Sequence, residues 1–122
     1  MRIQNHRECG WYKQKGKEMK VNILGTEYSV EIDDTLEKTN ADGMCKVYDK
    51  VISIRSVDSM LCDEDSTDTK KMRFNEVLRH EIVHAFFNEA GLQEYSADEQ
   101  LVDWIAIQFP KIRKAFEECN CM

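Results

Sequence analysis

Several features that define whole classes of protein are missing from this sequence. Only one of its 122 residues is proline, and 42% of the residues are hydrophobic while 33% are charged, which is typical of a folded globular chain. No apolar run approaches the roughly 18 to 20 residues that a membrane span needs, and the N-terminus lacks the apolar core of a signal peptide. We therefore expect a cytoplasmic protein without a membrane segment.

An excess of positive charge is also missing. The formal net charge is −6 and the sequence pI is about 5.1. A chain with this charge repels phosphate backbones and anionic lipid surfaces. Neither nucleic acid nor a membrane is therefore expected as the principal partner.

The cysteines lack the regular pairing of a disulfide framework or a zinc ribbon. There are five, an odd number, and no two of them form a CxxC pair. We interpret them as reduced thiols that serve as small apolar residues. A soft metal site made by Cys119 and Cys121 with Cys9 or His6 is a less favoured alternative.

The length suits one compact domain rather than two. Residues 1–18 are polar and show no periodicity, so we predict an N-terminal tail followed by a domain at residues 19–122. Met19, which opens the patterned part of the chain, is a candidate alternative start.

Two hairpins are predicted before the middle of the chain. Residues 20–32 alternate between apolar and polar side chains around Gly25-Thr26, which favours two antiparallel strands. Residues 35–43 are predicted to be a loop that ends in an Asp42-Gly43 turn, and residues 44–48 and 51–55 are predicted to pair around Asp49-Lys50. The acidic segment 63–68 is interpreted as a solvated connector, because it lacks the glycine and terminal glutamate of a calcium-binding loop.

Helical periodicity dominates the remainder. Apolar residues recur at helical spacing from Met72 to Phe86, before Gly91. Ser96 and Glu99 have the spacing of a capping box at the start of a second amphipathic helix, and Pro110 is predicted to open a third helix that ends near Glu118. The fold class is therefore α+β, with a small, mostly antiparallel sheet and C-terminal helices.

The segment His80-Glu81-Ile82-Val83-His84 carries the chemistry. Residues four apart lie on one face of a helix, so both imidazoles can point at one metal ion. Glu81 is offset around the helix by one position, where its carboxylate can take a proton from a zinc-bound water instead of binding the metal. This spacing predicts Zn²⁺ as the cofactor, His80 and His84 as metal ligands and Glu81 as the general base of peptide hydrolysis.

A third ligand is expected among the downstream carboxylates, which are Glu89, Glu94, Asp98, Glu99 and Asp103. We favour Glu99, with Asp103 one turn further on as the acceptor of the free N–H of a ligand histidine. Asp98 and Glu94 remain alternatives, because zinc accepts either type of carboxylate. Glu99 could instead only bond the helix N-terminus as part of the capping box, and Asp103 could be a plain solvated aspartate.

Two other classes of function are weighed against a zinc peptidase. One is a zinc-stabilised module of the same fold that binds a partner protein without cutting it. The other is a helical interaction domain in which the two histidines are incidental. The expected partner of the peptidase is a protein or peptide substrate, including regulatory proteins.

At this point the chain resembles the zincin-like metallopeptidases, in particular the small HExxH proteins of phages and mobile elements grouped with the ImmA/IrrE repressor-cleaving proteases. The similarity runs from about Met19 to Pro110 through the segments GMCKVYDKVISI, VLRHEIVHAF and EQLVDWIAIQFP. In that family the last segment begins with the glutamate ligand and closes with proline, which implies these roles for Glu99 and Pro110. The run EQLVD also resembles the ExxxD ligand helix of thermolysin-like gluzincins, whereas Asp103 and Trp104 replace the more usual ImmA/IrrE residues.

The resemblance implies a zincin-like fold in which the small sheet packs on the HExxH helix. A strand beside the cleft, either 51–55 or its neighbour, would bind an extended peptide by strand addition. Tyr48, Tyr95 and Arg79 are candidates for stabilising the oxyanion, although each is also a common packing or surface residue. The family's repressor-binding and DNA-linked extensions have no counterpart here, so the resemblance implies no particular substrate.

Overall fold

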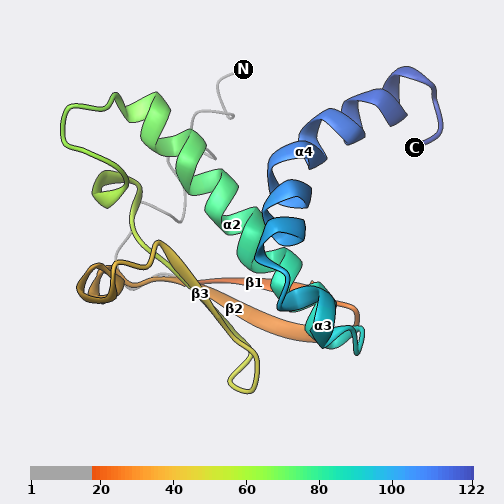
Figure 1. Cartoon of the computed structure of the whole chain (residues 1–122), viewed down its shortest axis with the longest axis horizontal. Coiled ribbons are helices and arrows are strands. Elements are labelled where there is room, and N and C mark those ends of the chain that lie inside the picture. Colours follow the sequence, from red (N-terminus) through yellow and green to blue (C-terminus); the bar gives the residue numbers. More distant parts are fainter. Residues whose placement is uncertain (1–17) are drawn as a thin grey trace.

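The computed structural model describes residues 18–122, which form an α+β fold in which helices cover one face of a four-stranded mixed sheet (Figure 1). The predicted tail 1–18 lies outside the described residues except for Glu18, which is the first residue of strand β1. In chain order the elements are β1 (Glu18–Ile23), β2 (Thr26–Ile32), η2 (Asp34–Thr39), β3 (Gly43–Lys46), β4 (Val51–Ile54), η3 (Val57–Ser59), α2 (Thr67–Glu89), α3 (Gln93–Ser96) and α4 (Glu99–Glu118).

The first predicted hairpin is confirmed, but its turn lies one residue earlier than expected. β1 and β2 are antiparallel, with Ile23 opposite Thr26, so the turn consists of Leu24 and Gly25. Both have positive φ, 50° and 93°, the conformation that glycine tolerates and that two-residue hairpins require. The side chain of Asn22 accepts a hydrogen bond from the Gly25 N–H and closes the turn.

The second hairpin is also present, with shorter strands than predicted. β3 ends at Lys46, which pairs with Val51, so residues 47–50 form a four-residue loop. Gly43 opens β3 and is not a turn residue as predicted. The sheet order is β1-β2-β4-β3, with β2 and β4 parallel and the other two pairings antiparallel. The prediction of a mostly antiparallel sheet omitted this parallel pairing.

The crossover between the parallel strands contains a short helix where a loop was predicted. The 3-10 helix η2 spans Asp34–Thr39, and the side chain of Asp33 caps its N-terminus by accepting from the Thr35 N–H. Its Leu36 is buried. The prediction of an irregular loop at 35–43 is therefore wrong for the first five of these residues, because a single apolar residue carries too little periodicity to reveal a helix.

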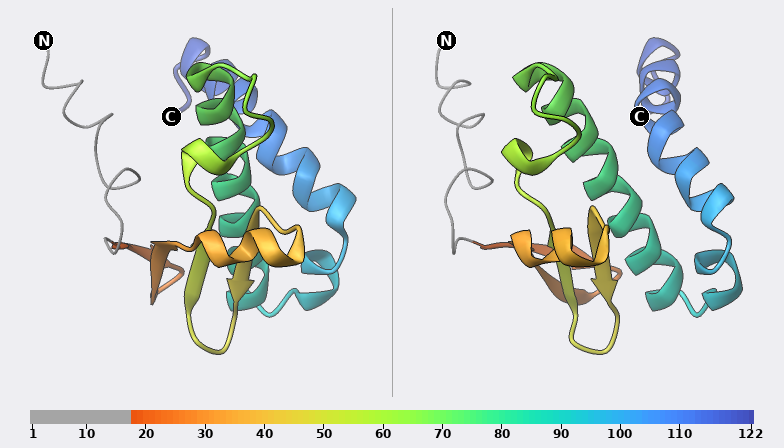
Figure 2. Two further views of the ribbon diagram at one scale, coloured as in Figure 1. Left: turned by 90° about the vertical axis from the view of Figure 1, so that its left-hand side faces the viewer. Right: turned by 60° about the vertical axis from the view of Figure 1, so that its left-hand side comes forward.

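The long helix α2 crosses the sheet and covers its inner face (Figures 1 and 2). It begins at Thr67, because the Ser66 side chain accepts from the Thr69 N–H at the N-terminus. The last two residues of the predicted connector 63–68 therefore belong to the helix. The side of α2 that faces the sheet completes the hydrophobic core. Phe74, Val77 and Ala85 of this helix belong to one buried cluster with strand residues that include Tyr28 and Ile52.

One continuous helix, α4, follows the short α3 turn, so the predicted break at Pro110 is wrong. Proline has no N–H to donate to the carbonyl four residues earlier, which is that of Ala106. The Arg79 side chain of α2 donates to this carbonyl instead, with an Nε···O distance of 2.6 Å. Among residues 18–122, no helix combines the length and apolar character that a membrane crossing requires.

Candidate metal centre

Three predicted ligands come together where α4 begins beside α2. His80 and His84 lie one turn apart on α2, and Glu99 is the first residue of α4. The Nε2 atoms of the two histidines are 3.1 Å apart. The Glu99 carboxylate lies 3.0 Å from Nε2 of His80 and 3.3 Å from Nε2 of His84. These are the sole described His, Cys, Asp or Glu side chains that converge in this way.

The spacing of these atoms fits a tetrahedral ion. Two donors that each lie about 2.0 to 2.1 Å from a tetrahedral zinc are about 3.3 Å from one another. The observed separations of 3.0 to 3.3 Å match that value. Without a cation, a carboxylate and two imidazole nitrogens this close would have to share protons. Two neutral imidazoles and one carboxylate are also the ligand set that a catalytic zinc uses.

Each histidine is held by a second partner through its other ring nitrogen. Nδ1 of His80 lies 2.7 Å from Oδ1 of Asp103, and Nδ1 of His84 lies 2.9 Å from Oγ of Ser96. Asn88 donates to the same Ser96 oxygen and to the His84 carbonyl. Because the Asp103 carboxylate can only accept, Nδ1 of His80 must carry the proton, which leaves the Nε2 lone pair free for a metal.

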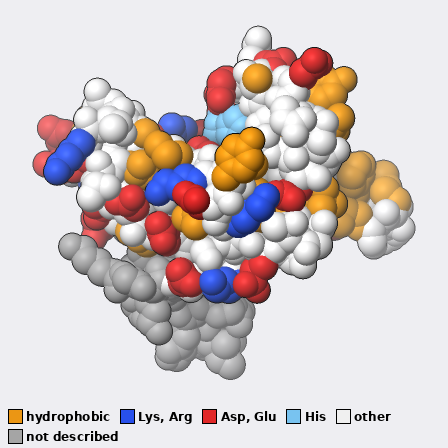
Figure 3. All heavy atoms as spheres, turned by 90° about the horizontal axis from the view of Figure 1, so that it is seen from below, with side chains coloured by type: hydrophobic (Ala, Val, Ile, Leu, Met, Phe, Trp, Pro, Cys, Tyr) orange, Lys and Arg blue, Asp and Glu red, His pale blue; other side chains and the backbone are white. Residues whose placement is uncertain are grey.

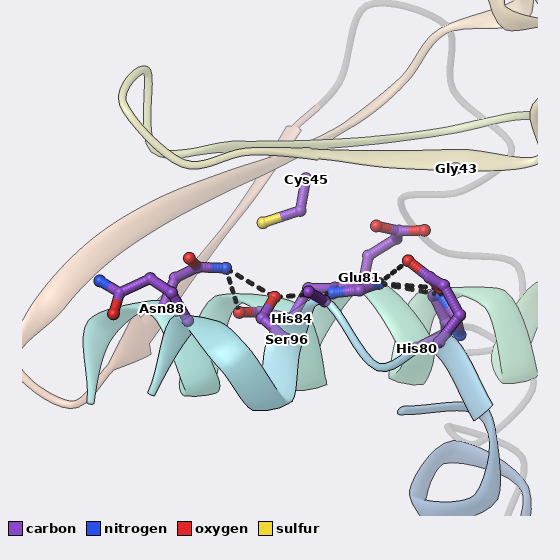
Figure 4. A pocket seen from close by; sticks show the side chains of 10 residues that line it. Gly43, Cys45, His80, Glu81, His84, Asn88 and Ser96 are labelled. Carbon is purple, nitrogen blue, oxygen red and sulfur yellow. Dashed lines mark hydrogen bonds and ion pairs between the residues drawn. The ribbon is translucent and has the colours of Figure 1, made fainter. Parts of the chain in front are cut away.

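Glu81 is buried between α2 and the first residue of β3 (Figure 4). Only 7% of its surface is exposed, and within residues 18–122 its carboxylate has no hydrogen-bond or ion-pair partner. The pKa of this carboxyl is raised to about 7, mainly by burial; His80 lowers it in part, and the nearby Glu99 and Asp103 carboxylates act in the same direction as burial. Such a group is suited to accept and release a proton near neutral pH.

The close approach of β3 explains a glycine. A Cβ atom at Gly43 would lie 2.8 Å from Cγ1 of Val77 and 3.0 Å from Cγ of Glu81. Any side chain at this position would therefore force the Val77 and Glu81 side chains, or the strand itself, to shift. Gly43 lets β3 lie directly against the Glu81 side chain.

The site opens into a polar pocket of about 480 Å³ between α2, α3 and β3. The two histidine side chains are 17% and 14% exposed, and pale blue histidine surface is visible in Figure 3. Cys45 of β3 also lines the pocket (Figure 4). Burial, and next the Glu81 carboxylate, raise the pKa of this thiol to about 12, and Cys45 is not among the three side chains whose donor atoms converge.

The alternative ligands lie elsewhere. Asp98 caps α4 by accepting from the Leu101 N–H, and Glu94 is exposed on α3. Glu89 is tied to the sheet by three donors, Thr26, Tyr28 and Lys50. Ser96 does not cap α4, because Asp98 is the N-cap residue of this helix. The predicted capping box is therefore wrong, and the Glu99 side chain does not serve as part of it.

None of the three oxyanion candidates lines the pocket. Tyr48 is 98% exposed in the β3–β4 loop. The Tyr95 ring packs against Phe87 with a centroid distance of 5.9 Å, and the Arg79 side chain is bonded to the Ala106 carbonyl. The structure therefore assigns these three residues to surface and packing positions.

Sequence reasoning missed three residues that shape the site. Asn88 follows His84 by the same four-residue interval that separates the histidines, so helical spacing alone could have placed it on the same face. Ser96 was assigned to a cap, and Gly43 to a turn. Their contacts with His84 and Glu81 depend on how α3 and β3 pack, which local pattern does not encode.

The alternative cysteine site is not assembled by the described residues. Cys119 and Cys121 are exposed free thiols at the end of α4. Their proposed partners Cys9 and His6 lie outside the described residues.

No protein-family model, curated protein or solved structure that was compared with the chain matches it. What the site can do therefore follows from its own residues.

Proposed function

We propose that this protein is a zinc-dependent metallopeptidase of zincin-like fold. His80, His84 and Glu99 would hold the ion, and Asp103 and Ser96 would orient the two imidazoles. The proposal is supported by the convergence of three donor atoms at tetrahedral spacing and by the second partner of each histidine.

The proposal of catalysis rests on one observation, which is that the carboxylate of Glu81 is buried and unpaired among residues 18–122. Burying an ionisable group without a partner costs folding free energy, so such a group is typical of a functional site. Glu81 follows His80 directly and faces the same pocket. A structural carboxylate in this position would be expected to have a donor, as Glu89 has at the end of the same helix.

Bound zinc would polarise the scissile carbonyl and lower the pKa of a water molecule in the site. Glu81 would accept the proton of that water as its oxygen bonds to the carbonyl carbon. The same carboxyl group would then give the proton to the amide nitrogen as the C–N bond breaks. The reaction adds one water across one peptide bond and returns Glu81 to its starting state.

An extended substrate could be held by β3. Among residues 18–122 this strand pairs with β4 alone, which places it at the edge of the described sheet, and it lines the pocket. Its outer backbone groups are available to a peptide strand, which would pass over Gly43 and beside Glu81. The edge strand β3 is the neighbour of the other sequence-predicted candidate, β4, which is internal in the sheet.

A zinc-stabilised binding module is the second candidate, and one observation favours it. The candidate ligands come from two helices, so a bound ion would cross-link α2 to α4 and stabilise the fold without any chemistry. In that case Glu81 could be replaced without loss of function.

The two candidates are separated by incubating the zinc-loaded protein with a mixed peptide library and identifying the products by mass spectrometry. The peptidase is expected to cut peptides, to stop after chelation and to recover when zinc is restored. Glu81→Gln should retain zinc and cut nothing. Equal cleavage by Glu81→Gln would contradict the mechanism, and a zinc-loaded wild type without products would favour the binding module.

A further inference from the structure

An apolar stripe runs the whole length of α4. Its residues recur at alternating intervals of three and four, which is the spacing by which helices pair in coiled coils. The stripe consists of Val102, Ile105, Phe109, Ile112, Phe116 and Cys119.

The two ends of this stripe lie in different surroundings. Val102 is fully buried near α2, whereas Phe109 and Phe116 are 46% and 43% exposed. The second half of α4 extends away from the sheet, and hydrophobic side chains gather on the projecting part of the molecule at the right of Figure 3 (compare Figures 1 and 2). The pairing pattern of α4 thus continues beyond the point where this helix separates from α2.

A groove lies where the helices separate. It has a volume of about 580 Å³ between α2 and α4, and its lining includes Ile82, Val83, Phe86, Ile105 and Phe109. Phe86 is 40% exposed on its wall. Two cations also line the groove: Arg79, whose Nε donates to the Ala106 carbonyl, and Arg113, which is paired with Glu117 one turn further along α4. An apolar helix with acidic groups near its end would complement both features.

The chain itself carries such a helix. The projecting half of α4 presents Ile112 and Phe116 on the stripe and ends in two acidic residues, Glu117, which is paired with Arg113 of the same helix, and the exposed Glu118. A two-fold axis beside Ile112 would run two copies of this segment antiparallel. Phe116 of each copy would then lie opposite the stretch between Ile105 and Phe109 of the other, and its Glu118 would approach Arg79.

We propose that this face is a homodimer interface, in which the projecting half of each α4 fills the α2–α4 groove of a second copy. The contact is isologous, because each copy supplies both the helix and the groove, so the assembly closes at two chains. It buries the exposed phenylalanines and places opposite charges together at both ends.

The interface leaves the candidate metal centre open. His84 lines the polar pocket and Val83 lines the groove, so the two surfaces use different sides of α2. Dimer formation and zinc binding are therefore expected to be independent. Failure of one proposal would not decide the other.

The test is sedimentation of the full chain under reducing conditions, from about 1 to about 300 µM, the range in which small interfaces associate. The wild type is expected to pass from one chain to two as concentration rises. Phe116→Asp should weaken the dimer by about 10-fold or more. The matched control is Ile107→Asp, which introduces the same charge at another exposed apolar residue (42%) on the opposite side of α4. It should leave the dissociation constant unchanged.

Circular dichroism and zinc content would show that both variants remain folded. Glu118→Lys should weaken the dimer by a few-fold, and added salt should reduce the difference between it and the wild type. A wild type that stays monomeric at every concentration would overturn the proposal. The apolar face of α4 would then be a contact surface for the residues before Glu18 or for a different protein. Equal weakening by Phe116→Asp and Ile107→Asp would also overturn it, because the contact would then not depend on the stripe.

Discussion

Two carboxylates on the same helix, Glu81 and Glu89, differ in every respect that matters for function. Glu89 accepts from Lys50, Tyr28 and Thr26 at 2.7, 2.7 and 3.0 Å. These hydrogen bonds, with the Lys50 contact first, lower its pKa to about 2. Glu81 has no such donor among residues 18–122, and burial raises its pKa to about 7.

The difference teaches how a small fold separates stability from chemistry. Glu89 is fixed in its charged form and joins the end of α2 to β2 and the β3–β4 loop. Glu81 lies where charge is costly, and the proposed mechanism would use the change of protonation state that this burial allows near neutral pH. The variants below are expected to abolish or enlarge the difference between these two carboxylates and their surroundings.

The largest expected effect is on peptide hydrolysis. Glu81→Gln should lower turnover by about 10²- to 10⁴-fold, because the amide cannot accept the proton. Glu89→Gln, the matched substitution eight residues later, should leave turnover of the folded protein within about twofold of wild type. The measurement is the initial rate on one cleaved peptide at saturating zinc. Similar losses in both variants would remove the distinction between the two carboxylates.

Zinc affinity should depend on the acceptor behind His80. Asp103→Asn is expected to weaken zinc binding by about 10- to 100-fold, because a neutral amide oxygen holds the Nδ1 proton less strongly. Competition with a zinc-sensitive dye would measure this. Glu94→Gln changes the net charge equally at an exposed position on α3 and should have little effect. If the two variants lost the same affinity, general charge rather than the Asp103 contact would be responsible.

Because β3 packs directly against Glu81, one added methyl group at Gly43 is expected to destabilise the fold. Gly43→Ala should lower the free energy of unfolding by about 1–3 kcal/mol, because the new Cβ meets Val77 and Glu81. Val77→Ala removes one of these neighbours. In urea unfolding, the double variant should therefore lose less than the sum of the two single losses, by about 1 kcal/mol. Strict additivity would show that Gly43 does not need this space.

The smallest effect is the acid dependence of stability. Because the folded pKa of Glu89 is depressed, its stabilising contribution is fully present above its ordinary pKa of 4.5 and is lost as pH falls toward about 2. Glu89→Gln should be less stable than wild type at pH 6, and the difference should shrink over that acidic range. Urea midpoints at successive pH values would test this, and a constant difference would refute the assignment.

Most of the structural features that depend on short-range sequence pattern could be predicted from the sequence. Alternation revealed both hairpins, and helical spacing revealed α2 and the face that carries His80 and His84. The selection of Glu99 and Asp103 depended on the same spacing rule applied to the next helix. The Glu99 carboxylate lies within 3.3 Å of both imidazoles, and the Asp103 carboxylate lies 2.7 Å from that of His80, whereas their roles as metal ligand and acceptor stay predictions.

What it could not predict depends on contacts between distant segments. The parallel pairing of β2 with β4 follows from the path of the crossover, not from the strands themselves. Pro110 was expected to begin a new helix, but Arg79 from another element supplies the donor that proline lacks. Ser96 has the spacing of a cap, yet packing directs its hydroxyl to His84.

The central claim is that His80, His84 and Glu99 bind one zinc ion, and elemental analysis of the purified protein tests it most directly. After zinc loading and dialysis without chelator, the wild type is expected to retain about one zinc per chain, and a folded His84→Ala variant much less. A wild type that retains no zinc, or a His84→Ala variant that retains as much as wild type, would contradict the account.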